Sequence, residues 1–352
     1  MASWTCKKKI DMSCINNKVL DCIETKQFTN NGINVIQTIE VIKDIFEIDN
    51  KDVLMTCNGA MGLNAIIGGF DIFYKKKLRW IVQSFTFPCS KQGMLMDSII
   101  VDIDNNMGPN IIDLQNKIHE YDGIVITNCF GMSTNIHLYE KFCKDNNKIL
   151  VFDNAASSFS YYNDKNILNY GHACMVSLHH TKPIGFGEGG FIVFDKQYLE
   201  SMEKSICFGY TKTNRHNYDK YASNYKMSEI SCIFISEYLK NLRKIFEHHN
   251  ALIMYFIEKM KLYNLYDKVK LFTSFSDYNK SLLATIPLVF NKRVDIDIFV
   301  KNNIEAKKYY FPLDETCIYS KTLFDNIICL PLTLDIDYST IDLYITIIQL
   351  II

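Results

Sequence analysis

The chain has 352 residues, of which 48% are hydrophobic and 22% are charged, and its formal net charge at pH 7 is −1. This length predicts one large domain and a smaller one, and the composition is that of an ordinary globular protein. The near-neutral charge argues against a nucleic-acid or anionic-membrane partner, because both are bound by proteins with an excess of positive charge.

The twelve cysteines are scattered through apolar runs, without a Cys-x-x-Cys pair or the clustered spacing of metal ligands. We therefore expect no metal site, and we expect reduced thiols in a cytoplasmic protein. Residues 1–13 lack the apolar core of a secretory leader. The apolar run 345–352 is too short to span a bilayer, and we expect it to end a packed amphipathic helix.

The N-terminal part predicts one helix and one strand–helix junction. Residues 1–33 look irregular or loosely helical, and apolar residues at helical spacing then predict a helix over 35–48. A strand over 53–56 runs into Asn58, Gly59 and Ala60, and a helix follows through 63–67. Such a junction binds anions, because free backbone N–H groups and the helix dipole face the ligand. An ordinary strand–helix joint is the alternative.

Strands and helices alternate through the middle of the chain. We predict strands over 80–83, 99–101, 124–127 and 149–152, and helices over 111–121 and 138–145. This alternation favours a largely parallel sheet that is covered on both faces. Ligands of such sheets bind at the carboxyl ends of the strands, so polar and aromatic residues there can converge on one site. The residues at or just beyond these ends are Asn58, Phe87, Asp153 and Ser177.

The character of the sequence changes near residue 227. Long helices are predicted over 229–245 and 248–262, followed by a strand over 282–290 and a mixed α/β tail. We therefore predict a large domain over residues 1–228, including the N-terminal segment, and a small C-terminal domain with its linking helices over 229–352.

The most informative stretch is residues 174–194, CMVSLHHTKPIGFGEGGFIVF. Two short apolar runs bracket Lys182 and a glycine cluster, which predicts two buried strands that hold a loop rigidly. A lysine there can be desolvated, which lowers its pKa and leaves the amine free to attack a carbonyl. A surface lysine is the alternative. Asp153 and Ser177 favour a site, because pyridoxal phosphate needs a carboxylate for its ring nitrogen, a phosphate ligand and a reactive amine.

Nine segments give the chain a resemblance to the DegT/DnrJ/StrS family of sugar-nucleotide aminotransferases over nearly its whole length. Each segment is weak alone, but together they follow the family's order and spacing. They are FTNNG (28–32), CNGAMGL (57–63), QSFTFP (83–88), VDID (101–104), VFDNAAS (151–157), SLHHTKPIGFGEGG (177–190), NYKMSE (224–229), KKYYFPL (307–313) and CLPL (329–332). The chain looks most like the 4-aminotransferases of the viosamine or perosamine kind.

The resemblance implies an α/β protein of the fold type I aminotransferase class. Such a protein has a mostly parallel central sheet in a large domain and a smaller C-terminal α/β domain. The cofactor implied is pyridoxal 5′-phosphate, with pyridoxamine phosphate carrying the amino group between the two half-reactions.

The resemblance assigns three residues to the cofactor ring. Lys182 matches the lysine that binds the cofactor covalently and then moves the substrate proton, and some relatives with histidine there are dehydratases. Asp153 matches the carboxylate that pairs with the pyridinium nitrogen, and Phe87, rather than Phe85, matches the aromatic that stacks on the ring. The family's Gln or His is replaced by Ala156, which takes away a hydrogen bond from that side, with Ser157 as a weak candidate to replace it.

Further residues match the phosphate and substrate pockets. Asn58, Gly59, Ala60 and Ser177 resemble the phosphate cup, in which backbone amides replace a missing hydroxyl. Asn224 matches an asparagine that reaches the partner's phosphate, which implies a homodimer with shared active sites. Lys226 stands where the family has arginine, and a lysine lacks the bidentate fork. The residues matched to the sugar-nucleotide pocket are Tyr309, Tyr310, Phe311, Asn30, Asn31 and Lys226. We expect structural roles for His179 and His180, and Glu188 has no role that we can derive.

The reaction implied is a ping-pong transfer of an amino group from L-glutamate to a nucleotide-linked 4-keto-6-deoxyhexose. Its product is a 4-amino-4,6-dideoxy sugar nucleotide for glycan decoration. A 3-aminotransferase acting on a 3-keto-6-deoxy sugar nucleotide is one alternative. A non-catalytic regulatory protein that binds pyridoxal phosphate with the same fold is another.

Overall fold

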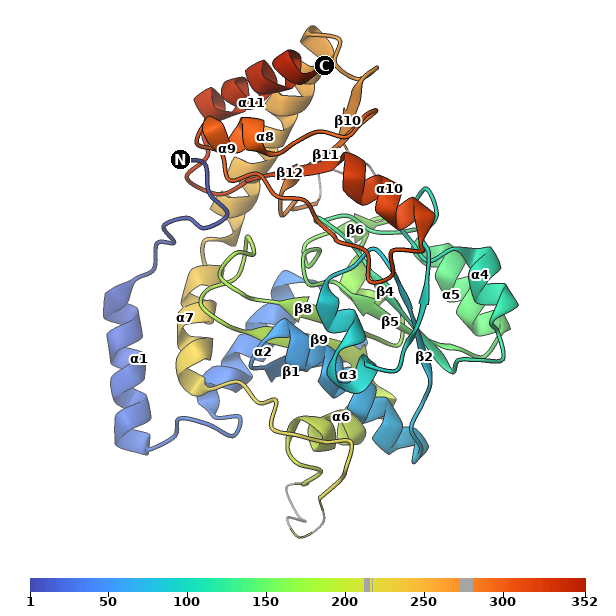
Figure 1. The fold of residues 1–352 in the computed structure, drawn as a ribbon. Coiled ribbons are helices and arrows are strands. Elements are labelled where there is room, and N and C mark those ends of the chain that lie inside the picture. Colours follow the sequence, from blue (N-terminus) through green and yellow to red (C-terminus); the bar gives the residue numbers. More distant parts are fainter. Residues whose placement is uncertain (212–215, 217, 272–280) are drawn as a thin grey trace.

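The computed structural model describes residues 1–211, 216, 218–271 and 281–352. Its centre is a seven-stranded sheet with the order β1-β9-β8-β5-β4-β2-β3 (Figure 1). Neighbouring strands from β3 to β8 pair in parallel, whereas β9 runs antiparallel to both β1 and β8. This confirms the predicted mostly parallel sheet. The strands are β1 (Lys51–Thr56), β2 (Trp80–Gln83), β3 (Ile99–Val101), β4 (Gly123–Thr127), β5 (Ile149–Asp153), β8 (Ala173–Ser177) and β9 (Gly190–Asp195).

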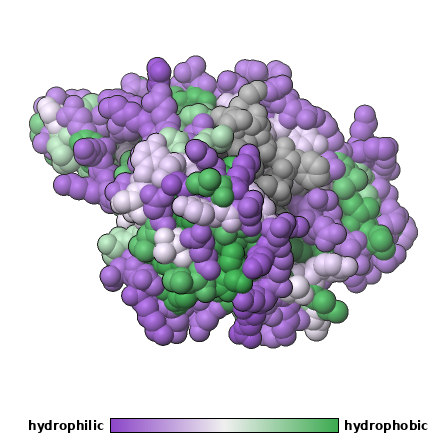
Figure 2. All heavy atoms as spheres, turned by 90° about the horizontal axis from the view of Figure 1, so that it is seen from above, coloured by the Kyte–Doolittle hydropathy of each residue, from purple (hydrophilic) through white to green (hydrophobic). Residues whose placement is uncertain are grey.

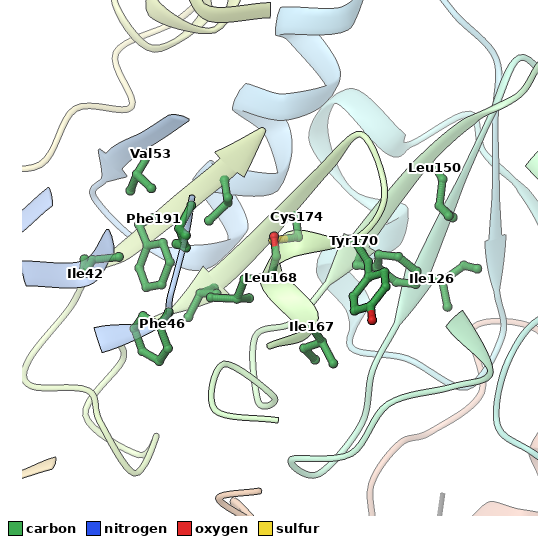
Figure 3. Packing of buried hydrophobic residues seen from close by; sticks show 14 of the residues in the cluster. Ile42, Phe46, Val53, Ile126, Leu150, Ile167, Leu168, Tyr170, Cys174 and Phe191 are labelled. Atoms are coloured by element: carbon green, nitrogen blue, oxygen red, sulfur yellow. The ribbon is translucent and has the colours of Figure 1, made fainter. Parts of the chain in front are cut away.

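The sheet is apolar on both faces because alternate residues of each strand enter different hydrophobic clusters. In β5, Leu150 and Phe152 belong to one cluster, and Ile149 and Val151 belong to another. Figure 3 shows part of the first cluster, in which Phe46 and Phe191 stack at 5.8 Å. Helices α2 (Ile33–Ile45), α4 (Ile111–Asn116), α5 (Ile136–Asp145) and α7 (Glu229–Leu239) cover the first face, and α3 (Gly59–Tyr74) and α6 (Leu199–Ile206) cover the second.

A second, smaller unit lies beyond one end of this sheet, at the top of Figure 1. It contains an antiparallel sheet of β10 (Val269–Leu271), β11 (Ile286–Phe290) and β12 (Ile327–Leu330) with its own hydrophobic cluster. Its helices are α8 (Leu242–Leu262), α9 (Asp297–Lys301), α10 (Ile318–Asn326) and α11 (Tyr338–Ile351). Figure 2 looks onto this end of the molecule and shows a hydrophobic area among hydrophilic residues. Within the described ranges, no helix has the length and hydrophobicity that crossing a membrane requires.

The N-terminal residues are more ordered than the sequence suggested. Residues 12–25 form a regular helix, α1 (Met12–Thr25), whose first turn is capped by Asp11 accepting from the backbone N–H of Ser13 at 2.9 Å. Before it, an extended arm runs along the smaller unit (Figure 1). In this arm the N–H of Ala2 donates to the carbonyl of Asn303, and the N–H of Glu305 donates back to the carbonyl of Ala2, both at 2.9 Å.

Three predicted boundaries are wrong. The helix expected over 111–121 ends at Asn116, where α4 passes into turns. The break expected between residues 245 and 248 falls at Lys240–Asn241, because α7 packs on α2 and α1 whereas α8 packs on α11. The strand expected over 282–290 starts at Ile286. The N–H of Leu282 donates to the carbonyl of Phe159, in the loop that follows β5, and not to a neighbouring strand.

Other predicted elements agree with the structure. The helix expected from residue 63 is α3, which begins earlier and runs to Tyr74, and α11 confirms the packed C-terminal helix. The loop after β5 also carries a two-stranded hairpin that the sequence did not predict, formed by β6 (Tyr161–Tyr162) and β7 (Lys165–Asn166). The domain division after residue 228 falls at the start of α7, and it stays a prediction.

Candidate active site

A cavity of about 440 Å³ opens at the carboxyl ends of β1, β4, β5 and β8. This is the edge at which the sequence predicted that separate segments converge. Its lining contains most of the residues that the sequence singled out. They are Asn58, Gly59, Ala60, Phe87, Asp153, Ser177, Lys182, Tyr309 and Tyr310.

Lys182 lies on the loop that joins β8 to β9. The loop folds back on itself, since the N–H of Lys182 donates to the carbonyl of His179 at 2.8 Å and the N–H of Leu178 donates to Gly189 at 2.8 Å. Gly187 has a φ of 65°, a conformation that disfavours other residues, and a Cβ at Gly190 would lie 2.7 Å from the backbone of Asn58. The glycines thus allow a tight loop to lie against the start of α3.

Asp153 ends β5 and faces the same cavity, with only 1% of its surface exposed. Its Oδ1 accepts from the N–H of Ala155 at 3.0 Å. Burial raises the pKa of the Asp153 carboxyl, and the N–H of Ala155 and the Lys182 cation oppose this rise. Burial lowers the pKa of the Lys182 amine, and Asp153 opposes that shift in turn. The two groups are therefore electrostatic partners, and the lowered pKa increases the fraction of neutral, nucleophilic amine.

The N-terminus of α3 also lines the cavity. Asn58 is the N-cap, and its side chain accepts from the N–H of Met61 at 2.9 Å, so this side chain is occupied within the helix. The N–H groups of Gly59 and Ala60 precede the first intrahelical donor and are available to an anion. A Cβ at Gly59 would lie 2.9 Å from the Cβ of Ser177, so the residue can only be small where the helix start meets β8.

These groups fit pyridoxal phosphate. One cavity is lined by a buried carboxylate, a lysine amine of lowered pKa, and a helix N-terminus beside a serine. These groups suit, in turn, the ring nitrogen, the aldehyde and the phosphate of the cofactor. The bound cofactor supplies an electron sink for the substrate carbon. Phe87 lies on the cavity with 53% of its surface exposed, whereas Phe85 is buried and packs edge-on against Tyr310 at 5.6 Å. Of these two phenylalanines, only Phe87 lines the cavity.

Ser157 does not replace the side chain that is missing at Ala156. Ala156 lines the cavity, but Ser157 is fully buried beside it. The Ser157 hydroxyl donates to the carbonyl of Asn128 at 2.7 Å and accepts from the N–H of Gly131 at 3.1 Å. Both of these hydrogen bonds connect the Ser157 hydroxyl to the loop after β4.

The remaining predicted residues do not line the cavity within one chain; they are Phe311, Asn30, Asn31, Asn224 and Lys226. Phe311 is 59% exposed and lies edge-on to Phe324 at 5.3 Å. Asn30 and Asn31 are exposed and left-handed, with φ values of 66° and 57°. Asn224 is exposed and accepts at 2.7 Å from Nζ of Lys226, so these two residues interact with each other.

Trp4 lines the cavity and was missed by the sequence. Its indole Nε1 donates to the carbonyl of Glu305 at 2.6 Å, and its ring lies edge-on to Tyr309 at 5.4 Å. The amine of Lys307 is 5.0 Å from the centroid of the indole. Nothing in the irregular pattern of residues 1–33 could have placed Trp4 here, because the contact depends on the docking of the arm.

The two histidines of the Lys182 loop have different surroundings. His179 lines the cavity, where its Nε2 lies 3.5 Å from Glu188, and its Nδ1 lies 2.8 Å from the hydroxyl of Thr181. His180 faces away, towards Cys6 of the N-terminal arm. His179 and Glu188 are thus additional members of the site, whereas the structural role expected of His180 agrees with its position.

Known proteins share this fold and sequence pattern. The family described as DegT/DnrJ/EryC1/StrS aminotransferase matches residues 10–347. The dTDP-4-amino-4,6-dideoxy-D-glucose transaminase of Shigella dysenteriae is 23% identical over 334 residues, which covers 88% of each chain. The GDP-perosamine synthase of Vibrio cholerae is 19% identical over 308 residues, which covers 85% of this chain and 82% of that one.

A solved structure shows the same fold. A putative PLP-dependent aminotransferase from Bacillus cereus superposes with a TM-score of 0.84 at 18% identity, covering 97% of this chain and 98% of that one. The family match extends over nearly the whole chain, and the cavity holds the groups that the cofactor needs. The protein is therefore an enzyme of the DegT/DnrJ/EryC1/StrS aminotransferase family, a transaminase whose cofactor is pyridoxal phosphate.

Proposed function

We propose that the enzyme transfers an amino group from L-glutamate to C4 of a nucleotide-linked 4-keto-6-deoxyhexose. One observation carries this proposal: the Lys182 amine, the Asp153 carboxylate and the N-terminus of α3 face a single cavity. Transamination at a keto carbon needs these three groups. A dehydratase is disfavoured, because the residue at the reactive position is lysine.

In this reaction Lys182 would hold the cofactor, and its free amine would then move a proton at the substrate carbon. Its lowered pKa suits both roles, because the amine must be neutral to accept that proton. Asp153 holds the proton on the ring nitrogen of the cofactor. Phe87 stacks on the ring, and the amides of Gly59 and Ala60 with Ser177 hold the phosphate.

Amination at C4 is supported by the names of the relatives. The Shigella relative is named for a 4-amino-4,6-dideoxy sugar carried on dTDP, and the Vibrio relative is named for a perosamine carried on GDP. In this chain, Tyr309 and Tyr310 form an aromatic wall of the cavity, and Tyr310 stacks on Phe130 at 5.5 Å with an interplanar angle of 9°. Such a wall suits the apolar face of a deoxy sugar.

We further propose a cytoplasmic homodimer in which Asn224 of one chain reaches the phosphate site of the other. Asn224 and Lys226 lie outside the cavity of their own chain, and Lys226 pairs with Thr56 at the carboxyl end of β1. All twelve cysteines are free, which supports a reducing compartment. The exposed Asn30, Asn31 and Phe311 are then candidates to contact the nucleotide sugar once the dimer has formed.

The test uses the protein reconstituted with pyridoxal phosphate. L-Glutamate alone should shift the cofactor absorbance and release 2-oxoglutarate. UDP-, dTDP- and GDP-linked 4-keto- and 3-keto-6-deoxy sugars are then offered, and the product is identified by mass spectrometry and NMR. We expect a 4-amino-4,6-dideoxy sugar nucleotide. A 3-amino product would contradict amination at C4, and an unchanged absorbance with glutamate would indicate a protein without turnover.

A further inference from the structure

The loop that carries Lys182 is supported from behind by two side chains of other segments. The amine of Lys8 donates to the carbonyl of Lys182 itself, at 2.7 Å, and to the carbonyl of Gly185. The hydroxyl of Tyr238, on α7, donates to the carbonyl of Pro183 at 3.2 Å. The carbonyl oxygens of Lys182, Pro183 and Gly185 therefore accept hydrogen bonds on the side of the loop away from the cavity.

Lys8 is held in this place without an acidic partner. Its amine lies 4.7 Å from the centroid of the Tyr238 ring, and no carboxylate among the described residues forms an ion pair with it. The other titratable groups that face this space are Cys6, His180 and His249. Burial lowers the pKa of the Lys8 amine to about 8. The carbonyl oxygens of the loop are thus the partners that stabilise its positive charge.

The arm that carries Lys8 is fixed on both sides of that residue. Before it, the N–H of Lys7 donates to Asp335 at 3.1 Å, and after it, the carbonyl of Lys9 accepts from Nδ2 of Asn241 at 3.1 Å. Closer to the N-terminus, the hydroxyl of Ser3 and the backbone N–H of Trp4 donate to the Glu305 carboxylate, at 2.7 and 3.1 Å. Lys8 therefore reaches the loop from a segment that cannot easily shift along the molecule.

We propose that Lys8 is a positioning residue for Lys182. By holding the carbonyl of Lys182 from behind, it fixes the height at which the Lys182 side chain enters the cavity. This inference rests on the proposed role of Lys182 as the cofactor lysine. It assigns a second function to the N-terminal arm, in addition to the place of Trp4 in the cavity wall. A misplacement of about 1 Å in a reacting group can lower a rate about 100-fold.

The experiment compares K8M, which keeps an unbranched chain but has no donor, with the control K9M. Lys9 is the exposed neighbour, and its backbone carbonyl accepts from Asn241. Two readouts are measured: hydrogen exchange of the 178–190 amides in the protein without cofactor, and the glutamate half-reaction with α-deuterated and ordinary glutamate. K8A, which likewise has no donor, serves as the second variant if K8M does not fold.

For K8M we expect exchange in residues 178–190 to be about tenfold faster, since a charge-assisted hydrogen bond is lost there. We expect the half-reaction rate constant to fall about 10- to 100-fold, with unchanged glutamate affinity and a larger deuterium isotope effect, because proton transfer by Lys182 is slowed. K9M should match the wild type in every readout.

Wild-type exchange, rate constant and isotope effect in a folded K8M or K8A would overturn the proposal. So would a loss of glutamate affinity alone, because a positioning residue acts on the rate constant. A wild-type protein without any glutamate half-reaction is a different result, since it contradicts the proposed function, while the exchange data still test the support of the loop by Lys8.

Discussion

The floor and the outer wall of the cavity are built in different ways. The floor comes from strand ends of one sheet, with Asp153 and Ser177 on β5 and β8 and Lys182 on the loop that follows. The outer wall comes from distant parts of the chain, with Trp4 in the N-terminal arm and Tyr309 in the smaller unit. The floor is buried and charged, and the wall is aromatic.

We therefore expect the floor to determine the chemistry and the wall to determine which acceptor sugar is selected. A buried carboxylate and a desolvated amine depend on the core of the sheet for their position, so changes there should affect every substrate. The wall depends on the docking of the arm and the smaller unit, so changes there should affect the acceptor sugar and leave the glutamate half-reaction intact. Substitutions in the floor should therefore have larger effects than substitutions in the wall.

Lys182→Met should give the largest effect. It removes the amine that reacts and moves the proton, so the rate of both half-reactions should fall by at least about 10³-fold. Stopped-flow absorbance with glutamate measures this directly. A K182M protein that retained a tenth of the wild-type rate would show that the floor has been assigned to the wrong lysine.

Asp153→Asn should come next. The amide cannot hold the positive ring nitrogen, so both half-reactions should slow by about 10²- to 10³-fold. The same loss with glutamate and with the amino sugar product is the signature of a floor residue. A loss confined to one of the two substrates would contradict the division.

His249 reports on the space behind the Lys182 loop. It is fully buried on α8, with Nδ1 3.2 Å from the carbonyl of Leu283, and burial lowers its pKa to about 4. Its stabilising contribution is present above pH 6.5 and is lost as the pH falls towards 4, because the unfolded chain binds a proton there and the folded chain does not. The loss is at most about 3 kcal/mol.

His249→Asn keeps a donor to Leu283 and removes this titration. Denaturant unfolding at pH 7, 5.5 and 4.5 should therefore show a shallower loss of stability in acid for the variant than for the wild type. Parallel pH dependences of the two proteins would exclude His249 as the source.

Trp4→Ala should give the smallest effect and the most selective one. Losing one aromatic wall residue should raise the KM for the nucleotide sugar about 3- to 10-fold. The rate constant of the glutamate half-reaction should stay at the wild-type value. If glutamate and the sugar were affected equally, Trp4 would act on the floor and the division would fail.

The floor and Tyr309 of the wall could be predicted from the sequence, whereas Trp4 could not, for a physical reason. Parallel strands bring their carboxyl ends to one edge, so the local pattern around Asp153, Ser177 and Lys182 was enough to place them together. Trp4 depends on hydrogen bonds to Glu305, which is 301 residues away in the chain. No local periodicity carries that information.

The helix boundaries failed for a related reason. Apolar residues recur at helical spacing on both sides of Lys240 and Asn241. However, α7 packs on α2 and α1 and α8 packs on α11, so only the tertiary packing sets the point where the first helix ends. The hydrogen bonds of Ser157 to Asn128 and Gly131 became visible only in three dimensions.

The central statement is that the amine of Lys182 binds an aldehyde cofactor beside Asp153. It is tested most directly by reducing the protein with borohydride in the presence of pyridoxal phosphate, followed by peptide mapping. We expect one phosphopyridoxyl group on the peptide that contains Lys182. No adduct, or an adduct on another lysine with residue 182 unmodified, would contradict this assignment.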